Sequence, residues 1–160
     1  MKVRSALASD RQGVIDAGIQ YTDHYTPTPE NVGALFDLAL LCEGMFVAEH
    51  EGQVVGFLCA IALPHPMTGE FYADVVAWFV LPAWRGSWAA AGLFRKMLRW
   101  SSTEALDMVK IARPVNSQIG TVYERAGFAP VEVVYLLKRA HGCRTADHDG
   151  GSGARELHQQ

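Results

Sequence analysis

The sequence has few cysteines, no strong excess of either charge and no long apolar run. Its three cysteines are too few, and odd in number, for a disulfide framework. A net charge of −3, from 14 basic and 17 acidic residues, argues against a general binder of nucleic-acid phosphates, which needs a concentrated basic surface. No run reaches the ~18 apolar residues of a membrane span, and no signal-peptide block follows Met1. We therefore expect a cytoplasmic protein that binds neither nucleic acid nor membrane.

The sequence does have enough apolar residues to fill a core. Its 160 residues fit one domain, and 49% of them are hydrophobic. Cys42 and Cys59 lie in apolar surroundings and are expected as small core residues. Residues 140–160 are polar, Gly-rich and without periodicity. We expect a domain over residues 1–139, followed by a flexible and dispensable tail over residues 140–160.

Hydrophobic periodicity predicts alternating strands and helices. The expected strands cover residues 3–7, 45–50, 53–63, 72–81, 108–112 and 128–138. Two helices are expected after the N-cap candidates Ser9 and Thr28, a third from Trp88 and a fourth over residues 116–126. The order β-α-α-β-β-β-α-β-α-β predicts an α/β fold, with helices packed on the faces of a mixed sheet.

The strongest candidate for chemistry is the turn after strand 72–81, which reads VLPAWRGSWAA from Val80 to Ala90. A strand that runs into a helix leaves unpaired N–H groups at the helix start. These donors and the helix dipole together form an anion site. Small residues let a phosphate approach the backbone here, and Arg85 adds a positive charge. A plain strand–helix connection explains the same residues equally well. The small residues are Gly86, Ser87, Ala89 and Ala90.

Three segments together resemble the GCN5-related N-acetyltransferase (GNAT) superfamily. The turn is similar to the family pattern Val-x-Pro-x-x-Arg-Gly-x-Gly-x-Gly/Ala. Asn116, followed by Tyr123 and then by Gly127-Phe128, is similar to the signature Asn…Tyr-x-x-x-Gly-Phe. Strand 72–80 stands where the family splays two parallel strands to admit its cofactor. The resemblance, from Met1 to about residue 139, implies the GNAT fold. It also implies transfer of an acetyl group from acetyl-CoA to a primary amine, by direct attack in a ternary complex.

The resemblance also implies roles for individual residues. Asn116 would contact the pantetheine arm, or act only as an N-cap. Tyr123 would donate a proton to the coenzyme A thiolate, or be only a core tyrosine. Trp88 replaces the middle Gly of the pattern, so its side chain must point away from the pyrophosphate or block the loop. A non-catalytic binding module of the same fold is therefore the alternative. The residues implied to hold the pyrophosphate are Arg85, Gly86, Ser87, Trp88, Ala89 and Ala90.

Removal of the proton from the attacking amine requires a base. Asp74 shares strand parity with Val76, Trp78 and Val80, and a carboxylate on an apolar strand is costly to bury unless it is paired or hydrated. We therefore expect Asp74 to reach a wet cleft and act as the base; the alternatives are a solvated strand-end acid or a partner of Arg4. The developing oxyanion would be stabilised by backbone N–H groups of Trp78, Phe79 and Val80.

The acceptor amine is expected to belong to a small molecule or a peptide. In the family, the segments that correspond to residues 21–29 and 64–70 flank the thioester, so these should line the acceptor site. His24 and Tyr25 are the substrate-binding candidates. The aromatic residues of both segments favour a partly apolar acceptor. No metal is expected, because none of the usual ligand spacings occurs; a homodimer is left open.

Overall fold

The computed structural model describes residues 1–21, 25–114 and 117–137 of the chain. These residues fall into two compact units, Met1–Gln118 and Ile119–Gln160, and each is described by itself. The expected tail over residues 140–160 lies outside the described residues, as do His24 and Asn116.

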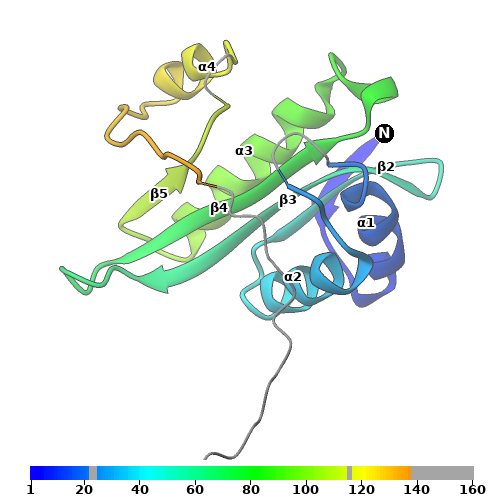
Figure 1. The fold of residues 1–160 in the computed structure, drawn as a ribbon, viewed down its shortest axis with the longest axis horizontal. Helices are drawn as coiled ribbons and strands as arrows, with labels where there is room; N and C mark the ends of the chain where they lie inside the picture. Colours follow the sequence, from blue (N-terminus) through cyan, green and yellow to red (C-terminus); the bar gives the residue numbers. More distant parts are fainter. Residues whose placement is uncertain (22–24, 115–116, 138–160) are drawn as a thin grey trace, which may run out of the picture. The chain divides into compact units, whose positions relative to one another are not determined.

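Five strands of the first unit form one mixed sheet. They are β1 (Lys2–Ser5), β2 (Met45–His50), β3 (Gln53–Pro64), β4 (Phe71–Val80) and β5 (Met108–Ile111). The strands lie side by side in chain order (Figure 1). The first three pairings are antiparallel, and β4 pairs with β5 in parallel. The mixed α/β sheet expected from the element order is confirmed.

Helices cover both faces of this sheet. Helices α1 (Arg11–Gly18) and α2 (Pro29–Leu41) lie on one face, and α3 (Trp88–Thr103) lies on the other (Figure 1). The core under α1 and α2 contains Phe57 and Cys59 of β3. On the other face, Trp78 stacks on Phe94 of α3, with 5.5 Å between ring centroids. Burial on both faces explains why β2 and β3 read as nearly continuous apolar runs.

The two helix starts that we predicted behave differently. Thr28 is the N-cap of α2: its hydroxyl oxygen accepts the Asn31 N–H at 3.2 Å, and Pro29 occupies the first helical position. The N-cap prediction for Ser9 is wrong. A short 3₁₀ helix, η1 (Ala8–Asp10), precedes α1, and the Asp10 carboxylate accepts the Leu7 N–H at 2.7 Å. Arg4 binds the same carboxylate and holds it in this position.

A β-bulge at Val76 decides which way the residues of β4 face. Cys59 pairs with Ala77, but its neighbour in β3 pairs with Val75, so Val76 is an extra residue. Residues paired across antiparallel strands point to the same face of the sheet. Asp74, which is paired with Ile61, therefore faces α1 and α2, whereas Trp78 faces α3. The predicted common parity of Asp74 with Trp78 and Val80 is wrong because the bulge reverses it.

The second unit contains α4 (Gly120–Arg125), which is shorter than the predicted helix over residues 116–126. Gly127 follows it with a φ of +94° and, as predicted, occupies the position after the C-cap. The predicted strand over residues 128–138 is not formed in the described residues 128–137. A strand exists only through pairing, and Pro130 removes one donor from this segment. Its apolar side chains are exposed, Val131 and Tyr135 most of all.

Candidate functional site

The candidate anion site begins where β4 ends. A single 3₁₀ turn, η2 (Pro82–Trp84), follows β4, and α3 begins at Trp88. Ser87 is the N-cap of α3, and its hydroxyl oxygen accepts the Ala89 N–H at 3.2 Å. The sequence therefore places the start of a sixteen-residue helix directly behind a short loop of small residues.

The amides of this loop divide into bonded and unbonded groups. The Arg85 N–H donates to the Pro82 carbonyl and the Ser87 N–H to the Trp84 carbonyl, both at 3.2 Å. The Ala89 N–H is held by the Ser87 side chain. In the described part of the chain, the N–H groups of Gly86, Trp88 and Ala90 have no acceptor. These three donors at a helix start are what an anion site requires.

The loop leaves space for a ligand in front of Gly86. Its φ of +85° lies in the left-handed region, and a Cβ added to it would meet no atom within 4 Å. Arg85 is exposed, its Nε donates to the Val80 carbonyl at 3.3 Å, and its guanidinium lies 5.8 Å from the centre of the Phe79 ring. The positive charge is therefore anchored at the entrance to the loop.

Trp88 does not obstruct these donors with its side chain. Its indole lies against Gly92, one turn along α3: a Cβ added to Gly92 would stand 2.7 Å from Cζ3 of Trp88. The ring is 49% exposed and runs along the helix. The large residue that departs from the motif is therefore compatible with a bound phosphate.

The pairing of β4 with β5 ends before β4 reaches this loop. Their parallel pairing covers Tyr72 to Val75 only, whereas β4 continues to Val80. Backbone N–H groups of an extended strand point alternately to its two edges. The Leu81 N–H donates to the carbonyl of Val55 in β3, so the amides of Val80 and Trp78 point to the opposite edge of β4. The Phe79 amide points to β3, which leaves Trp78 and Val80 as the two oxyanion candidates.

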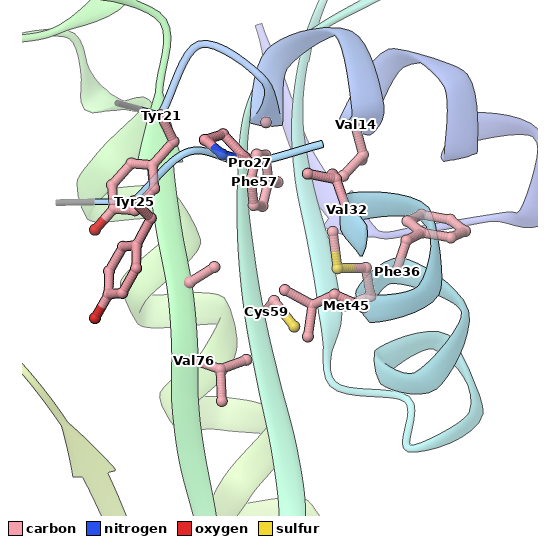
Figure 2. A pocket seen from close by; sticks show the side chains of 13 residues that line it. Val14, Tyr21, Tyr25, Pro27, Val32, Phe36, Met45, Phe57, Cys59 and Val76 are labelled. Atoms are coloured by element: carbon pink, nitrogen blue, oxygen red, sulfur yellow. The ribbon is translucent and has the colours of Figure 1, made fainter. Parts of the chain in front are cut away.

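An apolar pocket of about 260 Å³ lies between the sheet and the helices α1 and α2 (Figure 2). Tyr21, Tyr25 and Pro27, from the connection expected to line the acceptor site, form part of its wall. Figure 2 shows both tyrosine rings on the β4 side, across from Val32 and Phe36 of α2. The described lining residues are Val14, Gly18, Tyr21, Tyr25, Pro27, Val32, Leu35, Phe36, Met45, Phe57, Cys59, Val76 and Ala77.

The loop 64–70 contributes no described residue to this pocket. It joins β3 to β4, and Pro64 lies five positions after Cys59 in β3. At ~3.4 Å per residue, that distance is about 17 Å. His65 instead packs on Tyr72 of its own hairpin, with ring centroids 5.9 Å apart.

Asp74 and Cys59 both lie on the side of the sheet that faces the pocket. Asp74 is half-buried, and within the described residues its carboxylate has no hydrogen bond or ion pair. The alternative that Asp74 partners Arg4 is wrong, because Arg4 pairs with Asp10 and Glu49, both at 2.6 Å. Cys59 is fully buried, and burial raises the pKa of its thiol to about 12. It is therefore a neutral core thiol, as expected, whereas Cys42 is only half-buried.

The sequence matches the model of the acetyltransferase (GNAT) family over residues 16–128, which is more than half of the chain. The chain belongs to this family. The resemblance in the turn and in the segment from Asn116 to Phe128 is thereby confirmed at the level of the family. No protein with a curated description matches the sequence.

Solved structures of acetyltransferases share the fold. An acetyltransferase from Trypanosoma brucei has a TM-score of 0.66 and 17% identity, covering 86% of this chain and 99% of that chain. Glucosamine-6-phosphate N-acetyltransferase from Arabidopsis thaliana has a TM-score of 0.68 and 16% identity, and the match covers 86% of this chain and 97% of that chain. AAC(6')-Iy was solved in complex with the bisubstrate analog CoA-S-monomethyl-acetylneamine. It has a TM-score of 0.66 and 20% identity, and the match covers 87% of this chain and 98% of that chain. At these identities the likeness establishes the fold.

Tyr123, the candidate acid of this GNAT chain, belongs to the second unit. Its side chain is 7% exposed, and burial raises the pKa of its hydroxyl to about 12. Its ring packs on Phe128, with centroids 5.9 Å apart, and its carbonyl accepts the Phe128 N–H at 3.0 Å. The candidates Asn116 and His24 lie in the parts of the chain that the structure leaves undescribed.

Sequence reasoning missed the wall of the pocket contributed by α2 and β3. These segments are almost entirely apolar, so the sequence does not distinguish a residue that lines the pocket from one that is only part of the core. The lining residues concerned are Val32, Leu35, Phe57 and Cys59. Within the described ranges, no helix is long and apolar enough to cross a bilayer. No group of three or more His, Cys, Asp or Glu in those ranges could hold a metal ion.

Proposed function

We propose that this GNAT protein transfers the acetyl group of acetyl-CoA to an amine by direct attack in a ternary complex. The observation that carries the proposal is the loop before α3. Three N–H groups without acceptors in the described residues, from Gly86, Trp88 and Ala90, gather there around a glycine with positive φ. The loop follows the end of β4, whose last five residues lie beyond the pairing with β5.

The loop fits a diphosphate. The unbonded amides and the positive end of the α3 dipole attract an anion, and Arg85 adds a full charge. Nothing stands within 4 Å of a Cβ position at Gly86, so the phosphates can approach the backbone. The neighbour AAC(6')-Iy was solved with a CoA bisubstrate analog, which agrees with coenzyme A as the ligand of this fold. Bound acetyl-CoA supplies an acetyl group activated as a thioester.

Residues of the chain supply the hydrogen-bond donors, the base and the acid that the reaction needs. The amides of Trp78 and Val80 donate to the carbonyl oxygen, where negative charge develops as the amine attacks. Asp74 takes the proton that the amine nitrogen loses as the C–N bond forms. Tyr123 gives its proton to the sulfur as the C–S bond breaks, and it regains a proton from solvent.

The state of Cys59 argues against a role for this residue as a nucleophile. A cysteine nucleophile reacts as the thiolate. With its pKa raised to about 12 by burial, Cys59 is a thiol at neutral pH. We therefore assign the attack on the thioester to the amine of the acceptor and not to Cys59.

Isothermal titration with coenzyme A, followed by a thiol-release assay over a panel of primary amines, tests the proposal. We expect a dissociation constant in the micromolar range, about −8 kcal/mol, and release of thiol that depends on the amine. Absence of heat and of thermal stabilisation at millimolar ligand contradicts the proposal. Binding of coenzyme A without turnover of any amine identifies the non-catalytic alternative.

A further inference from the structure

We infer that the acceptor of this enzyme is a monoamine with a compact aromatic or branched aliphatic group, and that this group is buried in the pocket under α1 and α2. The inference rests on the proposed acetylation of an amine and names the class of that amine.

The chemistry of the pocket wall selects against charged and strongly hydroxylated acceptors. Its described lining residues include no charged side chain, and apart from Cys59 the only polar side-chain atoms they bring are the hydroxyls of Tyr21 and Tyr25. Transfer of a charged or polar group to such a wall without a partner is costly. A phosphorylated sugar would need cations here, and a polycationic amine would need several carboxylates. An uncharged hydrocarbon group needs neither.

The size and shape of the pocket fit one ring or one branched chain. Its volume is about 260 Å³, whereas an apolar cavity of about 150 Å³ already binds benzene. Tyr21 meets Phe79 edge to face at 5.7 Å and stacks on Tyr25 at 6.3 Å. Aromatic rings arranged in this way add a further ring favourably.

The position of Asp74 connects the pocket to the reaction. Val76 and Ala77 of β4 line the pocket, and Asp74 lies on the same face of β4. Two residues of an extended strand span about 7 Å. An acceptor with two to three bonds between its amine and its apolar group can place the nitrogen near Asp74 and the group in the pocket.

An amine panel with matched chain lengths tests this directly. Steady-state thiol release is measured with 2-phenylethylamine and 3-methylbutylamine, against ethanolamine and glucosamine. Burial of the apolar group should raise kcat/KM about 10- to 100-fold over the hydroxylated amines. Equal or better turnover of the hydroxylated amines overturns the inference but leaves the proposed function intact. Failure to bind coenzyme A or to acetylate any amine overturns both.

A pocket-filling variant adds a structural test. Ala77→Leu adds bulk to the wall of the pocket, and Ala62→Leu is its matched control: both alanines are half-buried, but Ala62 is paired with Ala73 on the face toward α3. Ala77→Leu should raise KM for 2-phenylethylamine at least about tenfold, with KM for methylamine and affinity for coenzyme A within about threefold of wild type. An unchanged KM for 2-phenylethylamine in a folded Ala77→Leu protein contradicts the inference.

Two further measurements keep the test independent of whether the variant folds. Benzyl alcohol, which has no amine, should inhibit the wild-type enzyme competitively against 2-phenylethylamine and not against acetyl-CoA. Inhibition competitive with acetyl-CoA, or none, argues against an acceptor pocket. If octanoyl-CoA is used better than acetyl-CoA, the pocket holds the acyl chain and the inference is wrong.

Discussion

The indole ring of Trp88 packs against Gly92, one turn along the same helix, and not across the amides at the helix start. Gly92 is buried, and a Cβ there would stand 2.7 Å from Cζ3 of Trp88 and 2.9 Å from Cγ2 of Val3. The absence of a side chain at Gly92 therefore makes room for the ring. Trp88 replaces a glycine of the family motif, and Gly92, four residues later, provides the space for its side chain.

Trp88→Ala should consequently leave the affinity for coenzyme A within about threefold of wild type, or about 0.6 kcal/mol. The variant keeps the backbone N–H of residue 88 and removes only a ring that lies away from the loop. Isothermal titration of both proteins measures the difference. A loss of about tenfold or more would show that the indole itself contacts the ligand.

Gly86→Val should weaken coenzyme A binding at least about tenfold. The φ of +85° at Gly86 is strained for a β-branched residue by about 1–3 kcal/mol. Relaxation of this strain moves the unbonded amides, and the added side chain occupies the space in front of them.

Gly52→Val is the matched control for this variant. Gly52 has a φ of +80° in the turn between β2 and β3, and a Cβ there also meets nothing within 4 Å. Both variants should lower the melting temperature by similar amounts, but Gly52→Val should keep wild-type affinity. If Gly86→Val and Gly52→Val bind coenzyme A with equal affinity, the loop before α3 is not part of the binding site.

Asp10→Asn should destabilise the fold by about 1.5–3 kcal/mol, since the carboxylate accepts charge-assisted hydrogen bonds. It binds Arg4 at 2.6 and 2.8 Å and the Leu7 N–H at 2.7 Å, and its side chain is 9% exposed. Arg4 lowers the pKa of Asp10 in the folded state. The stabilisation is therefore present above the unfolded pKa of about 3.9 and is lost as the pH falls through the lower folded value.

Thermal unfolding of both proteins between about pH 3 and pH 7 measures this effect. The gap in melting temperature between wild type and Asp10→Asn should be widest near neutral pH and should close in acid. Asp37→Asn is the control, because its pair with Arg11 is exposed and should contribute little. A gap independent of pH would assign the effect to packing.

Local signals allowed much of this fold and part of the site to be predicted. The start of α2 could be predicted because Thr28 caps it by a hydrogen bond to Asn31, only three residues away, and Pro29 favours the first helical position. The loop before α3 could be predicted from Gly86 and the small residues that follow it. The bulge at Val76 could not be predicted, because it depends on how β3 pairs with β4. Arg4, from β1, likewise decides the conformation of Asp10. The predicted strand over residues 128–138 is not formed in the described residues 128–137, and apolar composition alone does not reveal this.

Asp74→Asn should lower kcat about 10²-fold or more if Asp74 is the base. The amide keeps the shape of the side chain but cannot accept the proton from the amine nitrogen. Affinity for coenzyme A should stay unchanged. Asp16→Asn, in α1, is an exposed control that should keep full activity. The decrease in kcat of Asp74→Asn should be smaller for weakly basic amines, which are already neutral at the assay pH, than for strongly basic amines. An equal decrease in kcat for both kinds of amine would argue against a role of Asp74 as base.

Tyr123→Phe should lower kcat about 10²-fold while leaving affinity for coenzyme A unchanged. The ring remains to pack on Phe128, so the melting temperature should barely change. The raised pKa of Tyr123, about 12, keeps its hydroxyl protonated from about pH 6 to pH 9, so the loss should be constant over that range. Tyr135→Phe, in the same unit but 91% exposed, is the control. A thiolate can also leave unassisted or take a proton from water. If kcat of the Phe variant matches wild type across this range with a verified acceptor, departure of the thiolate needs no acid from the protein. Tyr123 is then a packing residue of its own unit.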